Sequence, residues 1–302
     1  MSVSRSKNEN AVADAPVSSL YEEADCCLNQ SKNESNVAEV IVLGTGTTVG
    51  VPAFYCDCVA CREAHANVLA QRTCPGIAIK ATNGSVTLID ASPDLRSQLV
   101  REGITAINQV LLTHEHYDHV GGLPHLEFYI KLARRDRLPV YTNEQTANIL
   151  VQQYAFMLDC LEIHIINAED TLRFDDVSYT ALKAKHSVGA FGFLLQTEKK
   201  SLAYFPDTAK LPDATIKHLL NMRPLDALLI DATFNGKNWM PDSHNNIASA
   251  IATAEELAAK KTWLTHLAMH YDTPITTTSL NALLDQYCDR IRIAYDGLRI
   301  AI

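Results

Sequence analysis

From about residue 39 onward, the chain alternates between short apolar runs and clusters of turn-forming residues. Glu39–Leu43 is a β-rich run that ends at Gly44, which predicts a strand. Two further runs, 76–81 and 85–91, are joined by Asn83-Gly84, a dipeptide that strongly indicates a hairpin in this setting. Residues 1–37 are rich in Ser, Asn, Glu and Ala without an apolar period, and we expect them to form a disordered extension.

The rest of the pattern mixes strands with helices. A helix is expected after Ser92-Pro93, with Ser92 as its cap and Pro93 in its first turn. Further strands are expected at 109–113, 139–141, 162–166, 177–183, 190–196, 201–205, 227–231, 262–265 and as a closing pair around 291–301, and further helices at 121–135, 213–221, 247–260 and 278–288. Strands followed by helices, twice over, predict an α+β fold with two packed sheets and outer helices, in one domain over residues 38–302.

Composition limits the classes of protein that this chain can be. Of its 302 residues, 47% are apolar, enough for a large core, but no run of eighteen apolar residues predicts a membrane span. The net charge of −9 and the lack of a basic stretch disfavour a long nucleic-acid substrate, whereas a small anionic substrate stays compatible. Arg5 and Lys7 are not followed by an apolar stretch, so we expect a cytoplasmic protein with reduced cysteines.

One segment concentrates metal-binding side chains. The apolar run 110–113 leads into His114-Glu115-His116-Tyr117-Asp118-His119, which reads H-x-H-x-D-H. Three imidazoles and a carboxylate this close cannot all bind one ion in a compact geometry, but they can serve two adjacent ions. Imidazole and carboxylate suit Zn, Mn and Fe alike. Gly121 and Gly122 follow and allow the backbone to approach the site closely.

Further ligands should come from the ends of later strands, where sites are commonly built. His186, Asp207 and His266 each follow an apolar run. Alone, each is more simply explained as a structural residue. As a set they have the order His, Asp, His that one superfamily shows.

On these motifs, the chain resembles the metallo-β-lactamase-fold hydrolases over about residues 39–302. The resemblance implies a four-layer αββα sandwich and two divalent metal ions, Mn or Zn, in the active site. By motif position, Asp207 would bridge the two ions together with a hydroxide, and Asp90 would orient a ligand histidine. The implied ligands are His114, His116 and His186 for one ion, and Asp118, His119 and His266 for the other.

A cysteine cluster narrows the resemblance. Cys56, Cys58 and Cys61 have C-x-C-x-x-C spacing, which supplies three of the four ligands of a structural zinc site. Together with the preceding glycine loop, 44–52, this cluster makes the chain similar to the phosphodiesterases of the carbon–phosphorus lyase pathway of phosphonate metabolism. Those enzymes open phosphoribosyl 1,2-cyclic phosphate. The likeness implies His270 as the fourth zinc ligand, although it follows His266 by four residues where the family has three.

The same likeness suggests the catalytic residues. His244 matches a non-ligand histidine of that family and is the candidate general acid, while Asp118 is a candidate for both catalysis and metal binding. A structural role for His244 is also open, in which it caps the helix beginning near Ile247.

The expected function is therefore metal-dependent hydrolysis of a small cyclic phosphate ester. Residues 91–96 and the cysteine cluster also resemble the pyrroloquinoline quinone biosynthesis protein, which departs from H-x-H-x-D-H. A tRNA 3′-processing endonuclease, a thioester or lactam hydrolase and a non-enzymatic carrier are further hypotheses for a chain with these motifs. The natural substrate and the oligomeric state stay open, with a homodimer as one expectation and neither nucleic acid nor membrane as a partner.

Overall fold

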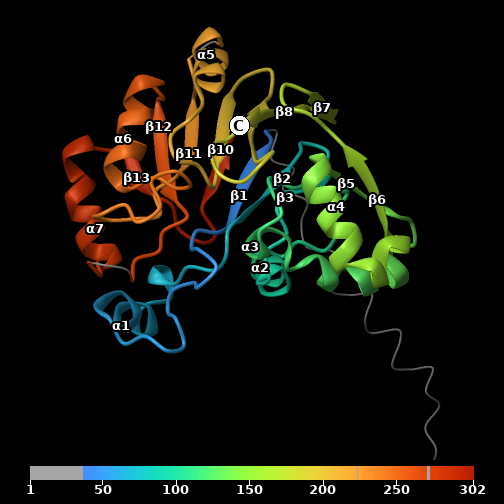
Figure 1. Ribbon diagram of the computed structural model, residues 1–302, viewed down its shortest axis with the longest axis horizontal. Helices are drawn as coiled ribbons and strands as arrows, with labels where there is room; N and C mark the ends of the chain where they lie inside the picture. Colours follow the sequence, from blue (N-terminus) through green and yellow to red (C-terminus); the bar gives the residue numbers. More distant parts are fainter. Residues whose placement is uncertain (1–36, 223, 271–272) are drawn as a thin grey trace, which may run out of the picture. The chain divides into compact units, whose positions relative to one another are not determined.

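The structure is a computed structural model, which describes residues 37–222, 224–270 and 273–302. Two seven-stranded sheets form its framework (Figure 1). In spatial order the first sheet contains β14 (Arg299–Ala301), β1 (Glu39–Gly44), β2 (Gly76–Lys80), β3 (Val86–Ile89), β4 (Gln109–Leu111), β5 (Leu138–Thr142) and β6 (Leu161–Ile165). The second contains β13 (Ile291–Ile293), β12 (Lys261–Thr265), β11 (Ala227–Asp231), β10 (Ser201–Phe205), β9 (Phe191–Gln196), β8 (Val177–Lys183) and β7 (Thr171–Phe174).

Helices cover the outer face of each sheet, which confirms the four-layer αββα sandwich. Between the sheets, buried residues such as Ile77 and Phe193 form one apolar cluster, and separate clusters join each sheet to its helices. The first sheet carries α2 (Leu95–Glu102) and α4 (Glu144–Gln153), and the second carries α5 (Asp213–Asn221), α6 (Ile247–Glu256) and α7 (Thr277–Leu284) (Figure 1). Two further helices, α1 (Val59–Ala66) and α3 (Tyr117–Val120), hold motif residues.

Because several strands are parallel, the strand ends that precede the motif residues lie at the same edge of the sheets. β3 runs parallel to β4, and β10, β11 and β12 are parallel to one another. Ligands of such sheets gather beyond the carboxyl ends of the strands. The residues after β3, β4, β10 and β12 are therefore the ones that can meet there.

Most predicted strands are confirmed, including the hairpin of β2 and β3, but three predictions were wrong. No continuous helix covers 121–135: α3 ends at Val120, and a 3₁₀ turn at Leu123–Leu126 and a π-helical segment at Tyr129–Arg134 follow. Two glycines and Pro124 weaken a regular α-helix there. A side chain on Gly122 would collide with the carbonyl oxygen of Ser92, which explains one of these glycines.

The second wrong prediction concerns Ser92. The N-cap of α2 is Asp94, and Ser92 bonds through its hydroxyl to Gln98 instead. Asp94 itself makes no capping bond, because its carboxylate accepts a hydrogen bond from the backbone N–H of Cys74.

The third wrong prediction is the closing strand pair. β13 joins β12 in the second sheet and β14 joins β1 in the first, so the two strands do not pair with each other.

The sequence pattern also did not predict α4 or β7. The extension expected over residues 1–37 lies, except for Val37, outside the described residues. Within the described part of the chain, no helix has the length and apolar character needed to span a membrane.

Candidate metal centre

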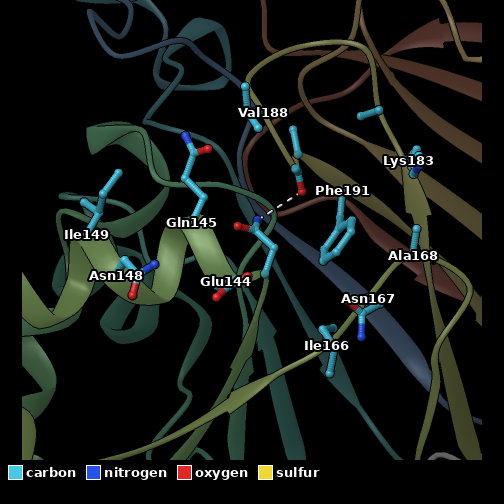
Figure 2. A pocket seen from close by; sticks show the side chains of 14 residues that line it. Glu144, Gln145, Asn148, Ile149, Ile166, Asn167, Ala168, Lys183, Val188 and Phe191 are labelled. Atoms are coloured by element: carbon cyan, nitrogen blue, oxygen red, sulfur yellow. Dashed lines mark hydrogen bonds between the residues drawn. The ribbon is translucent and has the colours of Figure 1, made fainter.

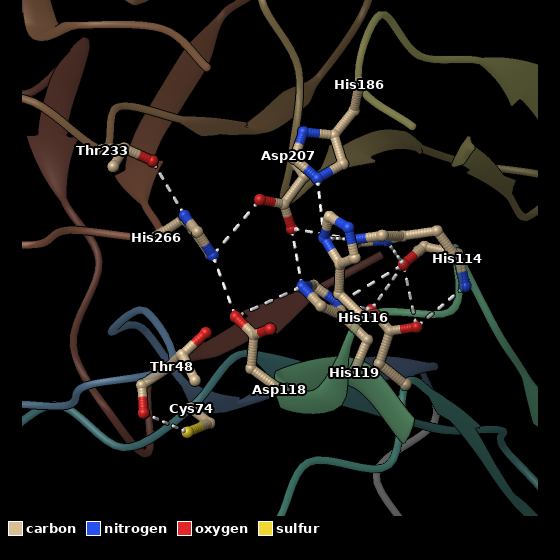
Figure 3. Close-up of polar contacts among 12 residues, drawn as sticks. Thr48, Cys74, His114, His116, Asp118, His119, His186, Asp207, Thr233 and His266 are labelled. Atoms are coloured by element: carbon tan, nitrogen blue, oxygen red, sulfur yellow. Dashed lines mark hydrogen bonds and ion pairs between the residues drawn. The ribbon is translucent and has the colours of Figure 1, made fainter. Parts of the chain in front are cut away.

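Seven ligand-type side chains converge at the carboxyl edge of the sheets (Figure 3). His114 lies just past β4 and His266 just past β12, while Asp207 follows β10 and His186 follows β8. The remaining three are His116, Asp118 and His119, which lie at or beside α3. The structure thus brings together every residue that the sequence suggested for the two active-site ions.

The first group contains three histidines. Nε2 of His114 lies 3.1 Å from Nδ1 of His116, and Nε2 of His186 lies 3.0 Å from the same atom. Their nitrogen atoms therefore point toward one small space. Three imidazoles that leave further positions open are a frequent arrangement for catalytic zinc.

The second group contains Asp118, His119 and His266. Oδ2 of Asp118 lies 3.4 Å from Nε2 of His266 and 3.7 Å from Nε2 of His119. One carboxylate and two imidazoles suit Zn, Mn or Fe, so the donor set does not select a single metal.

Asp207 lies between the groups. Its Oδ2 is 2.6 Å from Nε2 of His119 and 3.9 Å from Nε2 of His114, while its Oδ1 is 3.2 Å from Nε2 of His266. Despite this proximity, Oδ2 of Asp207 and Nε2 of His119 are buried without a hydrogen-bond partner of acceptable geometry. Buried polar atoms left in this way call for an explanation, and a divalent cation between the groups would satisfy both.

Two aspartate–threonine pairs hold the outward nitrogens of the histidines. The N–H at Nδ1 of His119 donates to Asp90 at 2.7 Å, and Thr113, itself bonded to Asp90, lies 2.9 Å from Nδ1 of His114. Fixing one ring nitrogen sets the tautomer and turns the other toward a metal. Asp90 has the expected orienting position.

The second pair repeats this device on the other sheet. Thr233 donates to Asp231 at 2.7 Å and lies 2.8 Å from Nδ1 of His266. Asp90 and His266 both have left-handed backbone conformations, with φ of 68° and 56°. Such strain persists where the surroundings impose it, often at functional sites.

The buried charges of the site oppose one another. Burial disfavours ionisation of Asp207, but the positive charges of His266 and His119 outweigh it and hold its pKa well below the usual value. Burial likewise disfavours a charged His266, yet Asp207 and Asp118 raise its pKa to about 9. Without metal, protons on His119 and His266, whose pKa values are both raised by the neighbouring carboxylates, thus balance the negative charge of those carboxylates. A divalent cation would replace those protons, so binding is expected to release them.

His244 lies at the edge of this cluster. Its Nδ1 is 2.9 Å from Oδ2 of Asp231 and 3.3 Å from Oδ1 of Asp207, and its ring is stacked on His266 at 5.2 Å. Across residues 37–302, as far as they are described, its Nε2 has no hydrogen-bond partner. The N-cap of α6 is Asn246, which excludes a helix-capping role for His244.

The cysteine cluster forms a separate group with His270. Nδ1 of His270 lies 3.1 Å from Sγ of Cys61 and 3.7 Å from Sγ of Cys58, while its Nε2 donates to the carbonyl of Gly50 at 2.6 Å. Cys56 completes the group. The glycine loop therefore orients the ring, and the four-residue spacing after His266 does not prevent His270 from reaching the thiols.

We expect Cys61→Ser to remove one bound zinc per chain and to destabilise the protein by at least about 3 kcal/mol, because a structural zinc stabilises the folded state directly. Cys61 is fully buried in α1, and its Sγ accepts a hydrogen bond from the backbone N–H of Ala53. Zinc content and the free energy of unfolding would be measured together, with exposed Cys288→Ser as the matched control. Full zinc retention in the Cys61 variant would contradict this expectation.

Asp231, Thr233 and Thr113 were missed from the sequence. A signal for the aspartate was present: Leu88-Ile89-Asp90-Ala91 recurs as Leu229-Ile230-Asp231-Ala232, each at the end of a buried strand. The chain likewise repeats Leu-Thr-His at 112–114 and 264–266. Once Asp90 is identified, this recurrence points to Asp231 as its counterpart.

Fold and site together define a metallo-β-lactamase-type protein. Residues 86–267 match the family described as the β-lactamase superfamily domain, and the chain belongs to this superfamily. Among solved structures, the chain is similar to a diphosphatase of the PhnP family, with a TM-score of 0.74 and 29% identity over 88% of this chain and 97% of that one.

Two other similar proteins limit how much function can be inferred for this chain from its similarities. Zn²⁺-bound PqqB from Methylobacterium extorquens has a TM-score of 0.72 and 21% identity, over 87% of this chain and all of that one, which shows the shared fold alone. An octanoyltransferase of Porphyromonas gingivalis is 28% identical over 273 residues, which is 87% of this chain but 51% of the relative. The chain spans about half the length of that protein, so the activity of the whole protein is not assigned to this chain.

Proposed function

We propose that this protein hydrolyses a small cyclic phosphate diester, of the phosphoribosyl 1,2-cyclic phosphate type, with two divalent ions. The observation that carries the proposal is Asp207, whose two oxygens face two separate ligand groups. Support also comes from the similarity to a diphosphatase of the PhnP family. A third ion, a structural zinc held by the cysteine cluster and His270, is part of the proposal.

Two divalent ions would polarise a phosphoryl oxygen and make water a strong nucleophile near neutral pH. The protein's own residues set the geometry. Asp90 and Thr113 hold His119 and His114, and Asp231 and Thr233 hold His266, so the ligand rings are fixed before substrate arrives. Asp118 adds a buried negative charge that favours cations over anions at this edge.

His244 would protonate the leaving oxygen. Asp231 accepts a hydrogen bond from the N–H at Nδ1 of His244, which holds the ring in place and leaves Nε2 to carry the transferable proton. An imidazole can give up a proton to an alkoxide near neutral pH. Asp231 is in this scheme a positioning residue.

The similar diphosphatase supports a second candidate, hydrolysis of a diphosphate linkage. Both reactions transfer a phosphoryl group to water, and they differ in the leaving group. A non-enzymatic, metal-binding carrier role is disfavoured because ligand groups for both ions are present.

Turnover by the metal-loaded protein tests the proposal. Protein reconstituted with Mn or Zn would be assayed on bis-p-nitrophenyl phosphate, ribose 1,2-cyclic phosphate, a 2′,3′-cyclic nucleotide, a diphosphate diester and a thioester. We expect hydrolysis of the cyclic phosphates that chelation of the metal abolishes. Hydrolysis of the diphosphate alone would favour the second candidate, and inactivity on every phosphate with two ions bound would refute both.

A further inference from the structure

The three histidines of the first ligand group are not held equally. The hydroxyl of Thr113 lies 2.9 Å from Nδ1 of His114, and the N–H at Nδ1 of His186 donates to the carbonyl of Ser243 at 2.7 Å. His116 faces the other two rings with its own Nδ1, and within the described residues its Nε2 has no hydrogen-bond partner. It is also exposed, whereas His114 is buried. A ligand histidine is normally oriented through its second ring nitrogen, so the position of His116 depends on its backbone.

Glu115 precedes His116 in the chain and is held on two sides. Its Oε1 accepts a hydrogen bond from Nε2 of Gln145 at 3.1 Å, and its Oε2 accepts one from the hydroxyl of Ser187 at 3.3 Å. Gln145 belongs to α4, which covers the first sheet, and Ser187 follows the ligand His186 in the segment between β8 and β9 of the second sheet. The carboxylate therefore ties the chain beside one ligand to the chain beside another.

The two segments are also joined by contacts that do not involve this carboxylate. Nδ2 of Asn143, the N-cap of α4, donates to the carbonyl of Gly189 at 3.0 Å (Figure 2). The backbone N–H of Phe191 donates to the carbonyl of Thr113 at 2.9 Å. Loss of the Glu115 carboxylate should therefore disturb the neighbouring ligands locally and leave the two sheets packed together.

Glu115 is not itself placed as a metal ligand. In each ligand group of the described residues the candidate donor atoms lie within 4.8 Å of one another, and Glu115 belongs to none of these groups. Both of its oxygens accept from uncharged donors instead. We therefore expect its contribution to come from the position that it gives to His116.

We propose that Glu115 is a positioning residue for the first ion, because it fixes His116 against His186 through Gln145 and Ser187. This inference rests on the proposed two-ion site and adds the residue that assembles the first half of that site. Groups that hold ligands in place commonly contribute a factor of about 10 to 100 in metal affinity. Glu115→Gln should preserve the effect, because an amide at this position can accept from Gln145 and donate to Ser187.

Binding of Mn²⁺ to the full chain tests the proposal. The cysteine cluster is kept filled with zinc, which thiolates prefer, and free Mn²⁺ is followed by electron paramagnetic resonance. In a His266→Ala background, which disables the second ligand group, we expect Glu115→Ala to weaken Mn²⁺ binding about tenfold or more and Glu115→Gln to weaken it less than about threefold. Adding Ser187→Ala to Glu115→Ala should have little further effect, because both substitutions remove the same hydrogen bond.

The Mn²⁺ dependence of turnover gives a second measurement. With His266 present, Glu115→Ala should raise the Mn²⁺ concentration for half-maximal hydrolysis of bis-p-nitrophenyl phosphate about tenfold or more, while kcat at saturating Mn²⁺ stays within about threefold of wild type. A general structural defect would instead lower kcat at every metal concentration. Glu144→Ala, which removes an exposed carboxylate next to Gln145, is the matched control and should change neither measurement.

Two results would overturn the inference. Unchanged Mn²⁺ binding in Glu115→Ala would exclude a positioning role, and equal weakening by Glu115→Ala and Glu115→Gln would assign the effect to charge. If the expected binding pattern is found but no phosphate ester is hydrolysed, the proposed function fails and the inference stands. A wild-type chain that binds no Mn²⁺ beyond its zinc would refute both.

Discussion

Asp207→Asn is expected to reduce metal-dependent hydrolysis of bis-p-nitrophenyl phosphate by at least two to three orders of magnitude. The substitution keeps the shape of the side chain but removes the charge that faces both ligand groups. Removing one member of a buried charged cluster costs about 3–5 kcal/mol, and each 1.4 kcal/mol is a factor of ten. No neighbouring carboxylate can replace it, because Asp118 faces the second group and Asp231 is bonded to Thr233 and His244.

The measurement has two parts, metal content per chain and turnover. We expect the variant to retain less than two active-site ions, while zinc at the cysteine cluster is unchanged. Asp213→Asn, an exposed aspartate in the first turn of α5, is the matched control. A variant with both ions and nearly full activity would show that Asp207 is not a shared ligand.

Replacing His244 by Gln should have an effect that depends on the leaving group. For a cyclic phosphate whose alkoxide must be protonated, kcat should fall by about 10² to 10⁴, the usual contribution of general acid catalysis. For bis-p-nitrophenyl phosphate, whose nitrophenolate leaves without a proton, the loss should be less than about tenfold. The ring lies against Asp207 and His266, so a purely structural disturbance would lower both rates alike.

Asp231→Asn tests the same proton-donating role of His244 through the residue that positions its ring. It should lower kcat for the cyclic phosphate less than the His244 variant does, because the imidazole stays in place but loses the carboxylate that accepts the hydrogen bond from its Nδ1. His65→Gln on the exposed face of α1 is the control for both. Equal losses on the two substrates would assign His244 to metal binding or packing.

The metal ligands within residues 114–119 could be predicted from the sequence because they are close together along the chain. Residues 114–119 lie on one turn of chain after a buried strand, and their spacing alone predicts two groups of donors. His186, Asp207 and His266 needed the family resemblance, since an isolated polar residue after a strand is common. The order of the strands within each sheet was not predictable either, because it depends on contacts between distant segments.

Other features were out of reach for a physical reason. Thr113 and Thr233 function through a hydrogen bond to an aspartate on a neighbouring strand, and no local pattern marks that bond. A pocket at the start of α4 takes its lining from α4, from the residues after β6 and from the segment between β8 and β9, so its residues are spread over 143–191 and no local pattern marks it. Helix α4 begins with Glu144 and Gln145 and has many polar residues, so the spacing of its few apolar residues did not predict a helix.

The separation of β13 and β14 into different sheets has a consequence for biosynthesis. Strand β1 emerges early from the ribosome, yet one of its two edges is completed only by Arg299–Ala301. Arg299 also forms an ion pair with Glu39, 260 positions earlier. Contacts this distant in sequence slow folding and leave strand edges exposed meanwhile. The first sheet therefore cannot be completed before Arg299–Ala301 has been synthesised, and until then one edge of β1 stays unpaired.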